Sequence, residues 1–286
     1  MKLKVGIQMY SVRNAMAKDP VAAIGEVAQM GYKYIELANL CADKDPGCGF
    51  GASPEALNAA IAPFDAKIIS AHIEPFDREN VERVLEYHKR LGTEYLMSKS
   101  IDVTYDAVMR QCELLGYIGE KCREYGIKHC LHAGVVATYP DRSNTLDLYV
   151  NNTEQGTLYF ELDTYWGLRS GMNPIYLIRK YADRIELIHQ KDLPKNFEKP
   201  LDVTRAAPSL AYDEWMQWYE STMTPDDFTE MGTGIMDIQG IVNAANKYTK
   251  AKYLILEQDF TKLDEMESVR RSMACMRGLD GLDFGN

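Results

Sequence analysis

The sequence predicts an α/β fold, a closed (β/α)8 TIM barrel with a long lid insertion between strand seven and strand eight. Eight short apolar segments typical of buried strands recur along the 286 residues, and most stretches between them carry helix signals. The segments end near Gln8, Leu37, His72, Ser98, His132, Asp163, His189 and Glu257, at intervals of 29, 35, 26, 34, 31, 26 and 68 residues. A barrel turns all eight strand ends to one face. No Gly-x-Gly-x-x-Gly follows the first strand, which disfavours a dinucleotide-binding sheet.

Strands and helices alternate through the first half of the chain. Strands are expected at 4–10, 32–37, 67–72 and 94–97. Helices are expected at 19–30, 53–61, 78–91 and 105–125. Two of these helices begin with a capping side chain before a proline, at Asp19-Pro20 and Ser53-Pro54. Glycines that end helices stand at Gly31, Gly92 and Gly126.

The second half continues the alternation but contains one long interval. Helix patterns occur at 146–150, where the pattern is weak, and at 174–181 and 266–276. Residues 193–235 form a stretch too long for a simple loop in a compact domain. Aromatic residues at 212–219 have helical spacing, and we interpret the stretch as a lid over the barrel mouth within a single domain, 1–286. A static helix packed on the barrel rim or on a neighbouring subunit is the alternative.

Four strand ends carry residues that can bind a metal: His132, Asp163, His189 and Glu257. Two imidazoles and two carboxylates suit Mn²⁺, Co²⁺, Zn²⁺ or Fe²⁺, and suit Mg²⁺ less because Mg²⁺ prefers oxygen ligands. Asp163 can instead cap a helix, His189 can be a buried core group, and Glu257 can pair with a cation at the rim. His132 shares its strand with His129, but alternation puts the two on opposite faces. We predict one divalent metal ion at the barrel mouth.

Five further residues are candidates for catalysis or substrate binding. His72 and Lys191 lie near strand ends, where His72 can act as an acid or base and Lys191 can polarise a substrate oxygen. A structural role for His72, and pairing of Lys191 with the aspartate that follows it, are the alternatives. Glu36, near the end of the second strand, can bind sugar hydroxyls. Trp166 and Trp215 offer apolar ring faces that suit the C–H surface of a sugar.

Composition favours a globular protein that acts on a small-molecule sugar or polyol. Hydrophobic residues make up 46% and charged residues 26%, so a large core can form. The formal charge of −10 repels phosphate backbones and anionic lipid, so neither nucleic acid nor a membrane is an expected partner. The six cysteines include no Cys-x-x-Cys pair and are expected to be reduced. We find no secretion signal and expect a cytoplasmic protein, with homo-oligomerisation left open.

Seven motifs resemble those of a known family. They lie at 5–13, 31–37, 69–72, 161–166, 188–192, 232–237 and 257–259. The motifs extend over nearly the whole chain, which resembles the xylose-isomerase-like barrel superfamily, in particular the bacterial sugar phosphate isomerase/epimerase group. The resemblance implies that Asp163, His189 and Glu257 bind the metal ion, with a fourth ligand at the end of the fifth strand.

The resemblance also implies a reaction. We expect metal-dependent isomerisation or epimerisation of a keto-sugar or related polyol, in which a base such as Glu257 removes a proton next to a metal-chelated carbonyl. Epimerases of the group carry Glu at the fifth strand end, where this chain has His132-Ala-Gly134. Because that carboxylate is absent, a dehydratase or β-eliminating lyase acting on a keto-inositol or 3-keto-sugar is the alternative. A non-catalytic sugar-binding protein with a structural metal is the alternative from another class.

The lid interpretation predicts that ligands change protease sensitivity. Limited proteolysis is expected to cut first within 193–235, and substrate together with metal is expected to slow this cut, because sugar chemistry in a buried site requires water to be excluded. Cutting at the same rate with and without ligands would identify 193–235 as a static element instead.

Overall fold

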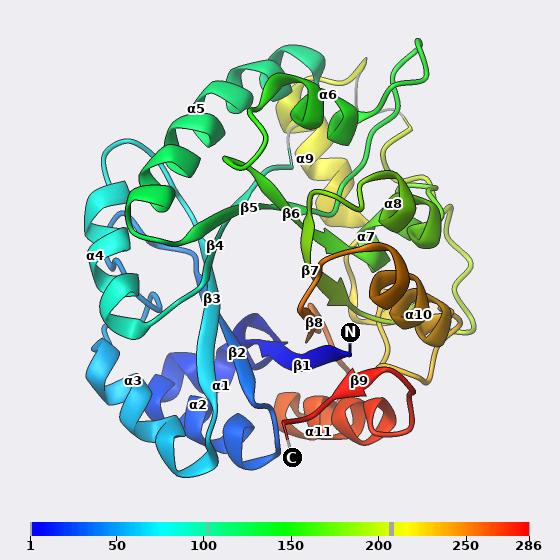
Figure 1. Cartoon of the computed structure of the whole chain (residues 1–286). Helices are drawn as coiled ribbons and strands as arrows, with labels where there is room; N and C mark the ends of the chain where they lie inside the picture. Colours follow the sequence, from blue (N-terminus) through cyan, green and yellow to red (C-terminus); the bar gives the residue numbers. More distant parts are fainter. Residues whose placement is uncertain (1, 102, 206–208, 286) are drawn as a thin grey trace.

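The computed structural model describes residues 2–101, 103–205 and 209–285, and its centre is a closed ring of eight parallel strands. The strands are β1 (Leu3–Gln8), β2 (Tyr34–Asn39), β3 (Lys67–Ile73), β4 (Tyr95–Lys99), β5 (Lys128–Ala133), β6 (Tyr159–Asp163), β7 (Ile185–Gln190) and β8 (Tyr253–Leu256). Each strand pairs with the next, and β1 pairs with both β2 and β8, which closes the ring. Figure 1 shows the ring with its helices outside. The predicted (β/α)8 barrel is confirmed.

Helices surround the ring (Figure 1). They are α1 (Arg13–Lys18), α2 (Pro20–Gln29), α3 (Pro54–Ile61), α4 (Val81–Leu91), α5 (Tyr105–Glu124), α6 (Thr145–Asn152), α7 (Thr164–Arg169), α8 (Pro174–Lys180), α9 (Tyr212–Ser221), α10 (Ile238–Tyr248) and α11 (Glu265–Met276). The side chains of Asp19 and Ser53 cap α2 and α3, as their sequence positions predicted.

Three of these helices, α1, α7 and α10, were not predicted. Both α1 and α7 are six residues long, too short to show an amphipathic pattern. The longer α10 does carry signals that could have identified it. Asp237 caps its first turn by accepting a hydrogen bond from the backbone N–H of Gly240 at 2.9 Å. Its buried residues then follow at helical spacing, at Ile238, Ile241, Val242 and Ala245.

The second strand begins later than expected, at residue 34 instead of 32. Tyr32 is fully buried, and its hydroxyl donates a hydrogen bond to the backbone carbonyl of Val269 in α11 at 2.7 Å. It therefore packs beneath a helix and does not join the ring.

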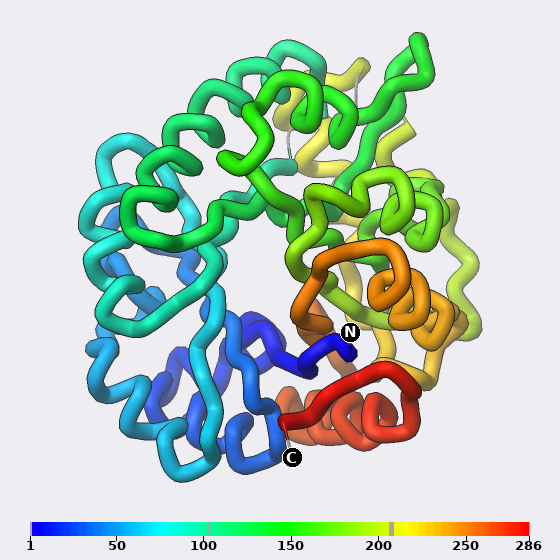
Figure 2. Tube along the Cα trace, in the orientation of Figure 1, coloured from blue at the N-terminus to red at the C-terminus, as the bar shows by residue number. Residues whose placement is uncertain are grey.

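A short final strand was also not predicted. β9 (Leu282–Asp283) pairs in parallel with β1 at Leu3 and Lys4, so the last strand lies beside the first (Figure 2). Two residues are too few to give a strand pattern in the sequence.

The inside of the ring contains an apolar layer below a polar one. The apolar layer consists of Ile69, Tyr95, Met97, Cys130, Leu187, Tyr253 and Ile255. Alternation along a strand returns every second side chain to the same side. Residues two positions after Cys130, Leu187 and Ile255 therefore also point into the ring, and these are His132, His189 and Glu257. Polar side chains thus occupy the C-terminal end of the barrel, where TIM-barrel active sites lie.

The segment after β7 leaves the barrel at Asp192, and its far end is hydrogen-bonded to the same residue. The carboxylate of Asp192 accepts hydrogen bonds from the backbone N–H groups of Gly232 and Gly234 at 2.9 Å and of Met236 at 3.1 Å. Between these points lies α9, which confirms the helix expected at 212–219. Movement of 193–235 as a lid stays a prediction.

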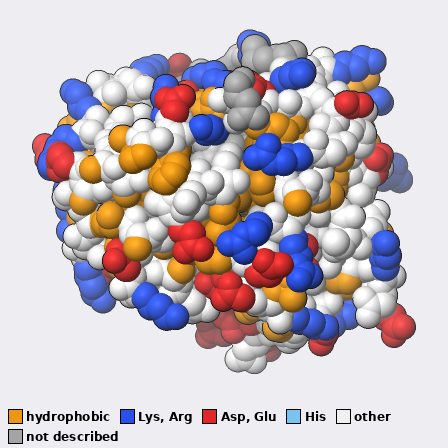
Figure 3. All heavy atoms as spheres, turned by 90° about the horizontal axis from the view of Figure 1, so that it is seen from below, with side chains coloured by type: hydrophobic (Ala, Val, Ile, Leu, Met, Phe, Trp, Pro, Cys, Tyr) orange, Lys and Arg blue, Asp and Glu red, His pale blue; other side chains and the backbone are white. Residues whose placement is uncertain are grey.

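Charges of both signs are distributed over the surface. On the face drawn in Figure 3, Lys and Arg side chains are interspersed with Asp and Glu. Within residues 2–101, 103–205 and 209–285, no helix combines the length and apolar character needed to cross a membrane.

Acid should destabilise the fold because two buried histidines are held neutral. Burial lowers the pKa of His88 in α4 and of His129 in β5 to about 3. Unfolded histidine binds a proton below about pH 6.5. The stability that these groups contribute above pH 6.5 is therefore lost as the pH falls toward 3. We expect the free energy of unfolding in urea to fall between pH 7 and pH 4, by about 3 kcal/mol for each histidine.

Variants isolate this effect from other titrating groups. His88→Gln and His129→Gln are expected to flatten the dependence of unfolding free energy on pH, because glutamine does not bind the proton. Lys89→Gln, at an exposed position of the same helix as His88, is the control and should keep the wild-type dependence. Parallel curves for all four proteins would contradict the assignment.

Candidate metal centre

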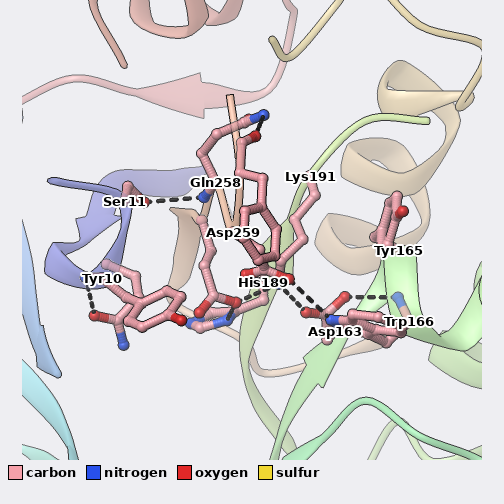
Figure 4. Close-up of polar contacts among 12 residues, drawn as sticks. Tyr10, Ser11, Asp163, Tyr165, Trp166, His189, Lys191, Gln258 and Asp259 are labelled. Atoms are coloured by element: carbon pink, nitrogen blue, oxygen red, sulfur yellow. Dashed lines mark hydrogen bonds and ion pairs between the residues drawn. The ribbon is translucent and has the colours of Figure 1, made fainter. Parts of the chain in front are cut away.

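Four side chains at the ends of β5, β6, β7 and β8 meet at one point. One ligand atom from each of His132, Asp163, His189 and Glu257 lies within 4.8 Å of the others. Figure 4 shows Asp163 and His189 turned toward a common centre, with Lys191 beside them. The structure therefore brings together the four residues that the strand ends predicted as metal ligands.

The two carboxylate oxygens of Asp163 make different contacts. Oδ1 accepts a hydrogen bond from the backbone N–H of Trp166 at 2.8 Å and caps α7. Oδ2 faces the cluster and lies 3.5 Å from Nε2 of His132. Although burial opposes ionisation, the ammonium of Lys191 lowers the pKa of Asp163 to about 2. Helix capping and metal binding, the two interpretations of this residue, are therefore compatible.

Carboxylates hold the ring of His189 on both sides. Its Nδ1 lies 2.9 Å from Oε2 of Glu257. Its Nε2 lies 2.7 Å from Oε1 of Glu36 and 3.1 Å from Oε1 of Glu161. Burial alone would lower the pKa of His189, but these carboxylates raise it well above its usual value. Metal binding at one nitrogen would require the proton there to leave, and the carboxylate at the other nitrogen would then orient the ring.

His132 has a buried nitrogen without a partner. Its Nε2 makes no hydrogen bond within the described part of the chain, and it lies 3.5 Å from Asp163 and 3.9 Å from Glu257. Burial lowers the pKa of His132, so the neutral imidazole offers a lone pair. A buried polar atom of this kind needs a partner, which a metal ion or a water molecule can supply. The donor set therefore fits a divalent metal ion.

Lys191 supplies positive charge next to this donor set. Its ammonium donates hydrogen bonds to Asp163 and Glu257, and it lies 3.6 Å from Asp259. Burial opposes the charge, but these carboxylates raise the pKa of Lys191 well above its usual value. A bound metal ion would share the same carboxylate oxygens. Asp192, the partner expected from the sequence, faces the insertion instead.

A second acidic pair, Glu36 and Glu161, lies deeper in the ring, and both side chains are fully buried. Nε2 of His72 lies 2.6 Å from Glu161 and 3.2 Å from Glu36. Burial disfavours the imidazolium, but the two carboxylates raise the pKa of His72 to about 9. Glu36 thus faces histidines and not the cavity where it was expected to bind sugar hydroxyls. An alternative donor set consists of His72, His132, Glu161 and His189.

Glu161 and Asp259 are site residues that the sequence analysis did not assign. Each lies two positions from a predicted ligand, Glu161 before Asp163 and Asp259 after Glu257, so alternation along a strand was the available signal. One oxygen of Asp259 accepts a hydrogen bond from Nε1 of Trp166 at 3.3 Å. Burial and the neighbouring carboxylates raise the pKa of Asp259 to about 6.

A cavity of about 330 Å³ lies over the cluster. Four predicted site residues line it: His72, His132, Trp166 and Glu257. Lys191 is buried beneath and is not among the lining residues in the described part of the chain.

Trp215 does not reach this cavity, contrary to its expected role in substrate binding. It is buried, its Nε1 donates a hydrogen bond to the backbone carbonyl of Ile101 at 2.8 Å, and its ring packs 5.4 Å from that of Tyr219. Tyr219, one helical turn later in α9, lines the cavity instead and lies 5.1 Å from the ring of Trp166.

The chain is similar in sequence to proteins named inosose dehydratase. An inosose dehydratase from Geobacillus kaustophilus (strain HTA426) is 24% identical over 202 residues, which are 59% of this chain and 61% of that protein. The chain therefore matches only about three fifths of the relative's length. No protein-family model matches the chain.

Solved structures share the fold over nearly the whole chain. A sugar phosphate isomerase/epimerase from Parabacteroides distasonis ATCC 8503 superposes with a TM-score of 0.73 at 19% identity, and the match covers 99% of this chain and 96% of that one. The IOLI protein with a bound zinc atom superposes with a TM-score of 0.68 at 16% identity, covering 96% of each chain. These likenesses show that the chain shares its TIM-barrel fold with these proteins and with a fusion protein that contains a xylose isomerase-like TIM barrel.

Metal content should depend on Asp163 and Glu257. Protein loaded with Mn²⁺, Co²⁺ or Zn²⁺ is expected to bind about one ion per chain by elemental analysis. Asp163→Ala and Glu257→Ala should each lower this content severalfold, because each change removes an anionic ligand. Unchanged stoichiometry in both variants would rule out the site.

Asp163→Asn separates metal binding from helix capping. The amide oxygen can still accept the hydrogen bond from Trp166 and cap α7, whereas a neutral side chain is a weaker metal ligand. We expect this variant to lose metal, while its Tm without metal falls less than that of Asp163→Ala, which removes the cap as well as the ion pair with Lys191.

Proposed function

We propose that the protein is a divalent-metal-dependent enzyme that removes a proton next to a carbonyl of a keto-sugar or related polyol. The observation that carries this proposal is the unpartnered nitrogen of His132, buried beside two carboxylates and His189 at the floor of a cavity. Similarity to an inosose dehydratase, to a sugar phosphate isomerase/epimerase and to a zinc-binding protein supports it.

The metal ligands in this proposal are His132, Asp163, His189 and Glu257. A bound ion would supply Lewis-acid polarisation of a substrate carbonyl and its neighbouring hydroxyl. The mixed nitrogen and oxygen donors suit Mn²⁺, Co²⁺, Zn²⁺ or Fe²⁺ better than Mg²⁺. Lys191 adjoins the same oxygens and would limit the net negative charge that the substrate meets.

Two lining residues are suited to opposite proton transfers. Glu257 is ionised and lines the cavity, because Lys191 and His189 overcome the burial that opposes its charge and hold its pKa well below the usual value. It is the proposed base. His72 lines the same cavity and is protonated at neutral pH, so it can donate a proton to an oxygen. These shifts leave Glu257 ionised and His72 protonated at neutral pH, which are the forms that a base and an acid require.

The identity of residue 132 favours elimination over epimerisation. Epimerisation by two carboxylates requires one base on each face of the reacting carbon. His132 stands where the resemblance implies the second carboxylate, and a metal-bound imidazole cannot serve as that base. One base and one acid suffice to expel a β-substituent. We therefore propose a lyase acting on a keto-inositol or 3-keto-sugar, with isomerase or epimerase as the second candidate because of the structural similarity.

Proton transfer at the substrate should occur on one face only. Metal-loaded protein is to be incubated with keto-inositols, ketoses and 3-keto-sugars in deuterated water. We expect deuterium to enter next to the carbonyl without inversion, detected by NMR, and a conjugated enone to appear in the ultraviolet spectrum. Glu257→Gln should slow both by about 100-fold or more because it removes the base. Glu79→Gln, at an exposed position, is the control.

The outcomes separate the candidate functions. Inversion of a carbon by two independent bases would replace the lyase with an epimerase. Absence of exchange and of elimination, in protein that binds metal and sugar, would leave a non-catalytic sugar-binding protein. His132→Glu restores a carboxylate at the fifth strand end, so it should keep the metal and add epimerisation.

A further inference from the structure

A second cavity, of about 260 Å³, adjoins the one over the metal centre. The two cavities share Tyr10, Ala38 and Leu40 as lining residues. Tyr10 follows β1 and Ala38 lies in β2, so the partition between the cavities stands at the C-terminal end of the ring. A ligand held at the metal centre therefore has a second compartment within reach.

The second compartment differs in chemistry from the first. Its other lining residues are Met9, Arg13, Met16, Cys41, Gly49 and Phe50. Arg13 is the one charged residue in this lining within the described part of the chain, and its guanidinium stacks 4.4 Å from the centre of the Tyr10 ring. Sugar hydroxyls placed here would lose hydrogen bonds to water without replacement, which is costly.

Internal hydrogen bonds shape the loop that forms the outer wall of this compartment. Asp45 accepts hydrogen bonds from the backbone N–H of Gly47 at 2.7 Å and of Gly51 at 2.6 Å. The side-chain amide of Asn39 donates to the backbone carbonyls of Asp45 at 2.7 Å and Gly47 at 2.9 Å. The wall is therefore formed before any ligand arrives, as is usual for ligand pockets.

Apolar side chains of this loop remain open to solvent. Leu40 is 55% exposed and Phe50 is 41% exposed, although both line the cavity. A bound apolar group could cover these exposed side chains, which border the formed cavity. The Tyr10 ring and the Arg13 guanidinium are flat, and the methionine side chains can contact aromatic rings favourably through sulfur. The lining therefore suits a planar apolar group.

We propose that the substrate carries a planar apolar substituent, with its keto-sugar ring over the metal centre and the substituent in the second cavity. The substrate class is then the glycoside of a keto-sugar with an aromatic alcohol. This inference rests on the proposed function and specifies the substrate of the same site. A phosphate is a poor alternative, because Arg13 is a single cation that already donates to the backbone carbonyl of Tyr10 at 3.1 Å.

The substituent is the leaving group in this proposal. The base removes the proton from the carbon next to the carbonyl, and the electron pair of that C–H bond forms a double bond to the carbon that bears the substituent. The C–O bond to the substituent breaks, both electrons go to its oxygen, and this oxygen takes a proton from His72 or from water. One keto-glycoside thus gives one enone and one aromatic alcohol, without an oxidant or reductant.

Matched glycosides test the assignment of the second cavity. Metal-loaded protein is titrated by calorimetry with the methyl and the phenyl glycosides of glucose, which lack the carbonyl needed for proton removal, and with fructose 6-phosphate. We expect the phenyl glycoside to bind at least about tenfold more tightly than the methyl glycoside. Phe50→Ala and Met16→Ala should lower this phenyl-to-methyl ratio severalfold. Tyr176→Ala in α8, where the side chain is 50% exposed, should keep it.

The binding ratio is measured without turnover, so it is independent of the proposed reaction. A ratio near one, with solvent exchange intact, would overturn the substituent proposal and leave the proposed function standing. Tighter binding of fructose 6-phosphate than of either glycoside would overturn it in favour of a phosphate site. A high ratio that Phe50→Ala lowers, without exchange or elimination of any compound, would support the cavity assignment and overturn the lyase.

Discussion

Alternation of side chains along parallel strands in a closed ring is the constraint on which the site depends. Each of β5, β7 and β8 places an apolar residue inside the barrel and then, two positions later, a metal-capable one. The same geometry that fills the lower barrel with Cys130, Leu187 and Ile255 therefore delivers three ligands to its upper end. The apolar residues that stabilise the barrel and the metal-capable residues lie in successive layers of the same interior. A shift of register in these strands would therefore displace both layers.

The site has a second requirement, which is charge compensation, because its polar layer is buried. Five carboxylates, those of Glu36, Glu161, Asp163, Glu257 and Asp259, carry five formal negative charges. When His189 binds a metal as the neutral imidazole, Lys191 and the protonated ring of His72 carry two positive charges, which leaves an excess of three negative charges. A divalent cation would reduce that excess to one. Buried carboxylates persist in proteins only where such partners are present.

Sequence reasoning located the fold and the four strand-end side chains that converge at the barrel mouth, because both depend on spacing along the chain. It did not place Glu36 or Trp215 correctly, for different physical reasons. Glu36 lies one layer deeper than the cavity floor, and the depth of a residue in the ring depends on strand stagger, which no local pattern records. The rotation of α9 about its own axis depends on packing against Ile101 and Trp166, and this packing turns Tyr219 toward the cavity in place of Trp215.

Both ends of the insertion after β7 are held at Asp192, whose carboxylate binds the returning backbone at three N–H groups. Asp192 therefore fixes the distance between the point where the insertion leaves the barrel and the point where it returns. The entropy of closing a loop between fixed points rises only slowly with its length. Segments of other lengths and sequences could therefore replace this one at small cost to the fold, without altering the strand ends that carry the metal-capable side chains.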